Sequence, residues 1–166
     1  MNQTTLVERA RRIRLLVLDV DGVLTDGRIY MGADGETLKV FHVRDGSGIV
    51  AAVRAGIAVA IISGRESAAV VRRAAELGIR HVRQGVHDKA AVLAELQREL
   101  GVAPAETACV GDDTPDLPML RDAGLAVAVA DAHPALAPRV HWTTSAEGGR
   151  GAVREVCDLL VTARAS

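Results

Sequence analysis

Two aspartates stand directly after a short apolar run near the start of the chain. The run is Leu15–Leu18, and Asp19 and Asp21 follow it, with Gly22 behind them. A run of this kind is typical of a buried strand, and like charges beside a buried strand cost free energy unless a partner neutralises them. Because Asp-Gly is also common turn chemistry, this segment alone leaves two interpretations open: a capped turn, or a site that holds a cation.

Polar groups follow two later apolar runs in the same way, after residues 58–62 and after residues 107–110. In an open parallel sheet, ligands bind beyond the carboxyl ends of the strands, so we expect these groups to share one crevice. Several carboxylates in one crevice must share protons or hold a cation. The groups are Ser63, Gly64 and Arg65 after the first run, and Gly111, Asp112, Asp113 and Asp116 after the second.

The residue types indicate which ligands the crevice would take. Carboxylates without a histidine or thiol among them favour a hard ion, most simply Mg²⁺, which prefers few carboxylates, several waters and a phosphate oxygen. Ser63, at a strand end before a helix, offers a hydroxyl and backbone N–H groups to a phosphate. Lys89, at the start of a later helix, offers a positive charge. The histidines with no metal-ligand spacing are His81, His87, His133 and His141.

The elements that must position these groups alternate between strand and helix, which implies a parallel sheet covered on both faces. The predicted fold class is therefore α/β, a three-layer Rossmann-like domain. Asp34 and Gly35, between two short alternating runs, predict a β-hairpin insertion after the first strand. Predicted strands are 14–18, 58–62, 79–82, 107–110, 125–130 and 140–144; predicted helices are 5–12, 47–55, 64–77, 87–100, 114–124 and 151–163, with a helical turn at 132–139.

The bulk composition narrows the class of protein. A chain of 166 residues fits a single domain, 1–166, with the hairpin insertion at about 26–41 and a C-terminal lid and helix at about 145–166. A net charge of −1 and 2% aromatic residues argue against nucleic acid and anionic membranes as partners. Cys109 and Cys157 lie in apolar runs and are expected to be buried free thiols. With no signal-like segment, we expect a cytoplasmic protein.

Lysine is rare in this chain. Eighteen arginines stand against two lysines, Lys39 and Lys89. Genomic base composition explains the excess of arginine over lysine. Because there are only two lysines, the surroundings of each one can be considered separately.

The segment "DVDGVLTDG" resembles motif I of the haloacid dehalogenase superfamily of phosphotransferases, which follows a D-x-D pattern. Ser63 in "IISGR" is similar to motif II of that superfamily, Lys89 to motif III, and "GDDTPD" to motif IV. The four motifs span residues 19 to 116 in the order that the superfamily has. An aspartate at the second position of motif I, here Asp21, favours a phosphatase.

The resemblance implies a mechanism for this chain. Asp19 attacks phosphorus to form an aspartyl-phosphate, and Asp21 protonates the leaving alcohol and then deprotonates the resolving water. The resemblance implies that Asp19, the backbone carbonyl of Asp21, and Asp112 bind Mg²⁺. Asp113 and Asp116 would bind water molecules on the metal or orient Lys89. Ser63 and Lys89 would bind the phosphoryl oxygens.

A closer resemblance covers nearly the whole chain beyond residue 12. The segments "GRIYMGADGETLKVFHVRDGSGI", "IISGRES" and "GGRGAVREVCDLL" are similar to the family of 3-deoxy-D-manno-octulosonate 8-phosphate phosphatases. That family implies a Mg²⁺-dependent cytoplasmic homotetramer in lipopolysaccharide precursor synthesis, whose hairpins associate and whose sites are closed by a neighbouring subunit. The substrate-binding residues implied are His42, Val43, Arg44, Asp45, Gly46, Arg65, Arg73 and Lys89. Three glycines around Arg150 indicate a flexible segment, from which we expect Arg150 to reach the substrate of its own or a neighbouring subunit.

Some alternatives stay open at this point. The 41 residues between Asp21 and Ser63 are too few for a large helical cap, and the apolar hairpin residues could pack on their own sheet or on another subunit. Val50 and Ser47 depart from the family pattern, which leaves a phosphatase for a nine-carbon sugar acid phosphate as the alternative. A phosphate-binding scaffold without catalysis fits less well, because a pure binder needs no nucleophile.

Overall fold

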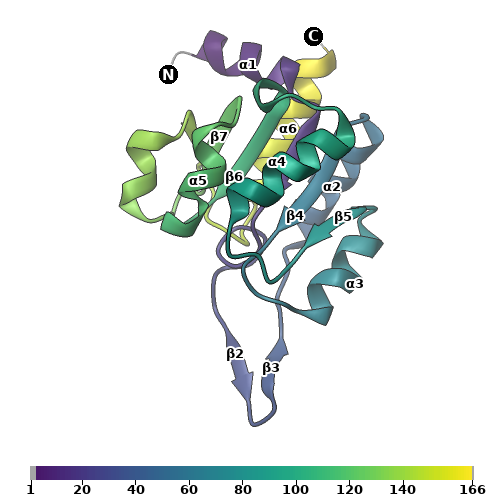
Figure 1. Ribbon diagram of the computed structural model, residues 1–166, viewed down its shortest axis with the longest axis vertical. Helices are drawn as coiled ribbons and strands as arrows, with labels where there is room; N and C mark the ends of the chain where they lie inside the picture. The colour runs from purple at the N-terminus through teal and green to yellow at the C-terminus, as the bar shows by residue number, and fades with distance from the viewer. Residues whose placement is uncertain (1–2, 166) are drawn as a thin grey trace.

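Six parallel strands form the central sheet of the computed structural model, which describes residues 3–165 (Figure 1). The strand order is β5-β4-β1-β6-β7-β8, so the first strand lies in the middle. Leu18 at the end of that strand pairs with Ile61 on one side and Val110 on the other. The polar residues that follow these three strands therefore emerge side by side. The strands are β1 (Leu15–Leu18), β4 (Ala58–Ile62), β5 (His81–Arg83), β6 (Thr107–Gly111), β7 (Leu125–Ala128) and β8 (Trp142–Thr143).

Helices cover both faces of this sheet, as predicted. Side chains alternate between the faces along a strand, so Leu16 and Leu18 of β1 join the core under α1, α2, α3 and α6, whereas Leu15 and Val17 join the core under α4 and α5. This two-sided burial explains why the first strand is apolar throughout. The helices are α1 (Gln3–Arg12), α2 (Val43–Arg54), α3 (Ala68–Glu76), α4 (Lys89–Leu100), α5 (Leu117–Arg121) and α6 (Ala152–Ala165).

No helix within residues 3–165 is both long enough and apolar enough to span a membrane.

The predicted hairpin is present and projects from one end of the sheet (Figure 1). Its strands are β2 (Tyr30–Gly32) and β3 (Gly35–Leu38), and Gly35 adopts a positive φ of 109° at the turn. The apolar side chains of the hairpin are largely exposed, up to 66% for Met31. These side chains could pack on the chain's own sheet or on another subunit, and packing on their own sheet is not observed. They are Ile29, Tyr30, Met31, Leu38 and Val40.

The second helix begins at Val43, four residues earlier than the predicted start at residue 47. His42 caps it, because its Nδ1 accepts a hydrogen bond from the N–H of Arg44 at 3.2 Å. The two glycines of "RDGSG" obscured this start, since glycine is unfavourable in helices. A methyl group on Gly46 would lie 2.4 Å from the guanidinium of Arg73, so the glycine allows a close helix contact.

Other boundaries differ by a few residues. The predicted helix over 114–124 is a 3₁₀ turn (Thr114–Asp116) followed by the short α5, since Pro115 and Pro118 lack the N–H groups that a continuous helix needs. Helix α3 begins at Ala68 instead of residue 64. The predicted strands over 79–82, 125–130 and 140–144 are 81–83, 125–128 and 142–143, and the other 3₁₀ turns are Pro104–Glu106 and Pro134–Arg139.

The glycines before α6 hold the C-terminal segment against the loop that follows β1. A Cβ on Gly148 would lie 1.7 Å from the carbonyl oxygen of Gly22, and the N–H of Gly149 donates to the carbonyl of Val23 at 2.9 Å. These glycines therefore serve a close backbone approach. The segment supports the loop that carries Asp21.

We expect Gly148→Ala to lower the free energy of unfolding by roughly 1–3 kcal/mol, because the added methyl group forces two backbone segments apart. Urea unfolding measures the change. Gly64→Ala is the matched control, since a Cβ there would meet only the carbonyl oxygen of Val86, at an ordinary 3.6 Å. Equal stability of the two variants would show that the close approach at Gly148 is unimportant.

Candidate active site

The carboxyl ends of β1, β4 and β6 open into one polar crevice. It brings together, from four separate segments, the residues that the sequence placed at strand ends and at the start of α4. His87, which no spacing singled out, lines it as well. The predicted residues that line the crevice are Asp19, Asp21, Ser63, Gly64, Arg65, Lys89, Asp112, Asp113 and Asp116.

A buried lysine between two carboxylates lies at the bottom of the crevice. Nζ of Lys89 lies 2.9 Å from Oδ1 of Asp19 and 2.6 Å from Oδ1 of Asp116, and all three side chains are at most one-tenth exposed. Burial alone would lower the pKa of Lys89, but the two adjacent carboxylates outweigh burial and raise it. Lys89 therefore stays protonated and can bind an anion.

Asp116 organises the loop after β6. Its Oδ2 accepts hydrogen bonds from the backbone N–H groups of Asp112 at 2.9 Å and Asp113 at 3.3 Å, while its Oδ1 holds Lys89. Both oxygens of Asp116 are therefore engaged. This geometry favours a role for Asp116 in orienting Lys89 over a role in binding water molecules on the metal. The side chain of Asp113 instead accepts from the N–H of Thr114.

The carboxylate cluster as a whole suits a divalent cation. One oxygen from each of Asp19, Asp112 and Asp116 lies within 4.8 Å of the others, against the single charge of Lys89. Burial and the nearby Asp116 and Asp19 raise the pKa of Asp112 to about 8. Burial and Asp116 likewise raise the pKa of Asp19 to about 6, although Lys89 opposes the shift. A hard cation would relieve this repulsion, and Asp19, Asp112 and the carbonyl of Asp21 are the groups that would hold it.

Gly22 allows the cluster to form. Its φ of 92° is favourable for glycine, and a Cβ at this position would lie 2.1 Å from Oδ2 of Asp112. The Asp-Gly pair therefore serves both as a turn and as room for a carboxylate from another strand.

Ser63 offers a donor site next to Lys89. Its side chain is buried, its N–H donates to the carbonyl of Arg83 at 2.9 Å, and its carbonyl accepts from the N–H of Val86 at 3.0 Å. The main chain of Ser63 is thus held by the end of β5 and the loop after it. The hydroxyl accepts from the N–H of Arg65 at 3.4 Å, and Ser63 lines the crevice, where a hydroxyl suits a phosphoryl oxygen.

A second charged cluster stands on the hairpin side of the crevice, and sequence reasoning missed two of its members. Lys39 pairs with Asp21, and Glu36 lies 3.2 Å from Nζ of Lys39 and 3.0 Å from Nη2 of Arg65. Although its burial opposes the change, hydrogen bonds from Lys39 and Arg65 lower the pKa of Glu36. One signal could have found Lys39: a lysine in a chain that otherwise uses arginine.

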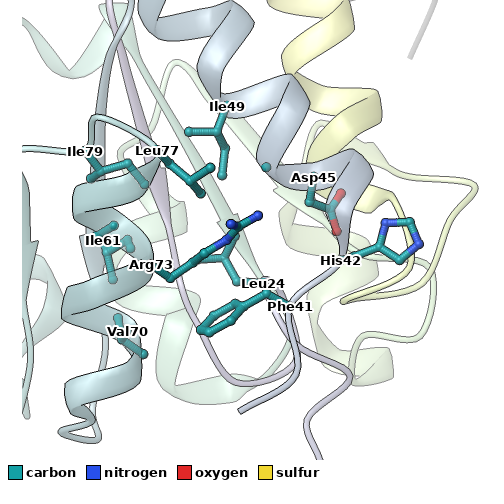
Figure 2. A pocket seen from close by; sticks show the side chains of 12 residues that line it. Leu24, Phe41, His42, Asp45, Ile49, Ile61, Val70, Arg73, Leu77 and Ile79 are labelled. Carbon is teal, nitrogen blue, oxygen red and sulfur yellow. The ribbon is translucent and has the colours of Figure 1, made fainter.

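Several predicted substrate-binding residues lie outside the crevice. Figure 2 shows Arg73 reaching from α3 towards α2 in a small, mostly apolar cavity that His42, Asp45 and Gly46 also line. Nη1 of Arg73 lies 3.1 Å from Oε2 of Glu76.

Asp45 holds two helices together. Its carboxylate is buried and accepts from the N–H groups of Gly151 at 3.3 Å and Arg154 at 2.8 Å, at the start of α6. Val43 and Arg44 are exposed on the first turn of α2. Arg150 is also exposed and pairs with Glu147 at 3.3 Å. In this single chain, Arg65 and Lys89 are the predicted substrate residues that reach the crevice.

Comparisons with known proteins show the family of this chain. A family model of haloacid dehalogenase-like hydrolases matches residues 81–155. The 3-deoxy-D-manno-octulosonate 8-phosphate phosphatase of Escherichia coli K12 is 54% identical over 159 residues, which cover 96% of this chain and 85% of that protein.

Two crystal structures show the same likeness. The chain is similar to the phosphatase of that name from Yersinia pestis, with a TM-score of 0.95, 51% identity, and coverage of 97% of this chain and 87% of that one. It is also similar to the one from Moraxella catarrhalis, in complex with a magnesium ion, a phosphate ion and a KDO molecule. There the TM-score is 0.96 at 41% identity, with coverage of 99% and 94%.

We expect Mg²⁺ to raise the melting temperature at pH 8 by about 5–10 °C at a hundredfold excess over its Kd. The shift should be smaller at pH 6, where the proton on Asp112, whose pKa is raised to about 8, competes with the cation. Differential scanning fluorimetry measures both shifts.

The control for this prediction is Asp112→Asn. In EDTA, the wild type should lose stability as the pH rises from the unfolded pKa of aspartate towards 8, because the folded carboxyl retains its proton more tightly. The variant should lose less, and Mg²⁺ should no longer stabilise it. An undiminished Mg²⁺ response in Asp112→Asn would place the cation elsewhere.

Proposed function

This chain belongs to the haloacid dehalogenase-like hydrolases and, within them, to the 3-deoxy-D-manno-octulosonate 8-phosphate phosphatases, and on this premise we propose the activity that follows. The protein is a Mg²⁺-dependent phosphatase that hydrolyses 3-deoxy-D-manno-octulosonate 8-phosphate to the free sugar acid and phosphate, in the synthesis of a lipopolysaccharide precursor. The observation that carries the proposal is the convergence of Asp19, Ser63, Lys89 and Asp112 in one crevice at the strand ends.

The first chemical step uses the two aspartates of the first loop. A carboxylate oxygen of Asp19 forms a bond to phosphorus, the bond between phosphorus and the sugar oxygen breaks, and Asp21 gives its proton to that oxygen. Lys89, which the paired carboxylates keep cationic, and the hydroxyl of Ser63 bind the phosphoryl oxygens. Mg²⁺, when bound, neutralises charge on the anionic phosphate.

The second step regenerates the enzyme. Asp21, now a carboxylate, takes a proton from a water molecule whose oxygen attacks phosphorus. The bond between Asp19 and phosphorus breaks, and inorganic phosphate leaves. The proposed intermediate is therefore an aspartyl-phosphate on Asp19.

A single chain brings few of the predicted substrate-binding residues to the crevice. Arg65 reaches the crevice and suits bidentate binding of a carboxylate. For Arg73, Arg150, His42, Val43 and Arg44 we propose contacts that form when another subunit completes the site. Asp45 and Gly46 are buried, and we propose that they hold the first turn of α2 in place for those contacts.

We propose a homotetramer in the cytoplasm as the working form. The exposed apolar side chains of the hairpin support association of subunits, because such surfaces are unfavourable in water. Cys109 and Cys157 are free and buried, in keeping with a reducing compartment.

We expect Mg²⁺-dependent phosphate release from a substrate panel to favour the eight-carbon sugar acid phosphate over a nine-carbon one, a hexose phosphate and a nucleotide. Asp19→Asn should lower kcat by at least about 10³-fold, because an amide is a poor nucleophile. A preference for the nine-carbon acid would change the assigned substrate and leave the proposed mechanism unchanged. Folded protein that releases no phosphate from any of them would support the non-catalytic scaffold.

We expect Met31→Lys to weaken the tetramer, because it places a charge on the exposed apolar surface of the hairpin. Light scattering after size-exclusion chromatography measures the mass. Ala94→Lys, on the exposed side of α4, is the matched control and should leave the mass unchanged. A wild-type protein that runs as a monomer would contradict the tetramer.

A further inference from the structure

A buried lysine at the base of the hairpin has no place in the mechanism above. Lys39 follows β3, and its neighbours Leu38 and Val40 are 48% and 52% exposed. The side chain of Lys39, in contrast, is only 3% exposed. Lysine is almost never buried without a partner, so its environment must supply negative charge.

The partners of Lys39 belong to both the hairpin and the crevice. Its ammonium group donates to Oδ1 of Asp21 and lies 3.2 Å from Oε2 of Glu36. Arg65 approaches the same two carboxylates from the loop after β4, with Nε 3.6 Å from Oδ2 of Asp21 and Nη2 3.0 Å from Oε2 of Glu36. Each oxygen of Asp21 therefore faces one cation, and Glu36 joins the two cations.

The only two lysines of the chain are divided between the two aspartates of the first loop. Lys89 holds Asp19, and Lys39 holds Asp21. An ammonium group is a compact point charge, whereas a guanidinium is a wide planar fork. The compact ammonium group of Lys39 contacts Asp21 and Glu36 at once.

We propose that Lys39, anchored by Glu36, is the positioning residue that holds Asp21 in place for proton transfer to the leaving oxygen. The proposal rests on the proposed function, in which Asp21 is the acid and base. Misplacement of a reacting group by about 1 Å can cost on the order of 10²-fold in rate. Without Lys39, the ion pair of Asp21 with Arg65 would remain, in which Nε of Arg65 lies 3.6 Å from Oδ2 of Asp21.

The test compares Lys39→Met with Arg28→Met. Both variants replace a cation of the hairpin segment by an uncharged chain of similar length. Arg28 is exposed, pairs with Asp26 at 3.5 Å, and does not line the crevice. Arg28→Met should keep wild-type kinetics, and thermal melts of both variants check that they fold.

The informative readout is kcat/KM for two leaving groups, because kcat/KM includes only the steps up to departure of the leaving group. A sugar alkoxide needs a proton from Asp21, whereas 4-nitrophenolate leaves as an anion without one. We expect Lys39→Met to lower kcat/KM for 3-deoxy-D-manno-octulosonate 8-phosphate about 10–100-fold and for 4-nitrophenyl phosphate less than about threefold.

Two results would overturn the proposal. An equal loss with both substrates would mean that Lys39 is merely structural. A raised inhibition constant of the free sugar acid, measured against 4-nitrophenyl phosphate, would mean that Lys39 binds the sugar instead of positioning Asp21.

Glu36→Gln tests the anchor and serves if Lys39→Met does not fold. It removes the charge that holds Lys39 and Arg65, and we expect the same selective loss with a smaller size. A uniform loss would contradict the anchoring role. If the wild type hydrolyses 4-nitrophenyl phosphate and not the eight-carbon substrate, the proposed function fails separately, and glycerol 3-phosphate replaces the sugar substrate in the Lys39 comparison.

Discussion

The burial of several carboxylates at the end of the central strand is the constraint on which this structure depends. Asp19 and Asp116 are nearly inaccessible to water, and Asp112 is close to both, yet among residues 3–165 Lys89 alone forms ion pairs with this cluster. Without another cation the cluster can persist only by keeping protons, as the raised pKa values of Asp19 and Asp112 indicate. The fold thus maintains a cluster of negative charge that a divalent cation would neutralise.

The sheet provides this arrangement through its register. Because β1 is central and pairs with β4 and β6 in parallel, three loops begin at the same level of the sheet. Two close approaches then complete the site: Asp112 lies against Gly22, and the segment at Gly148 lies against the carbonyl of that same glycine. The loop with Asp21 is consequently held from two sides by parts of the chain that are far apart in sequence.

The sequence was informative where a local pattern and a general rule sufficed. Apolar runs ending in polar residues predicted the strands, and the rule for parallel sheets predicted that Asp19, Ser63 and Asp112 would meet. Contacts between distant elements left no local pattern. The helical turn at Val43, which a buried Asp45 links to α6, is one case. The guanidinium of Arg73, which lies against Gly46 instead of in the crevice, is another.

The hairpin joins the surface of the protein to its chemistry. It exposes apolar side chains, whereas Glu36 on its second strand and Lys39 just after that strand contact Arg65 and Asp21 in the crevice. A chain of ion pairs between two segments transmits the orientation of one to the other only as far as the pairs stay formed. Since Lys39 is buried by these partners, a rotation of the hairpin would expose or unpair it at a cost. Any surface that immobilises the exposed apolar side chains of the hairpin would therefore also limit the motion of Asp21.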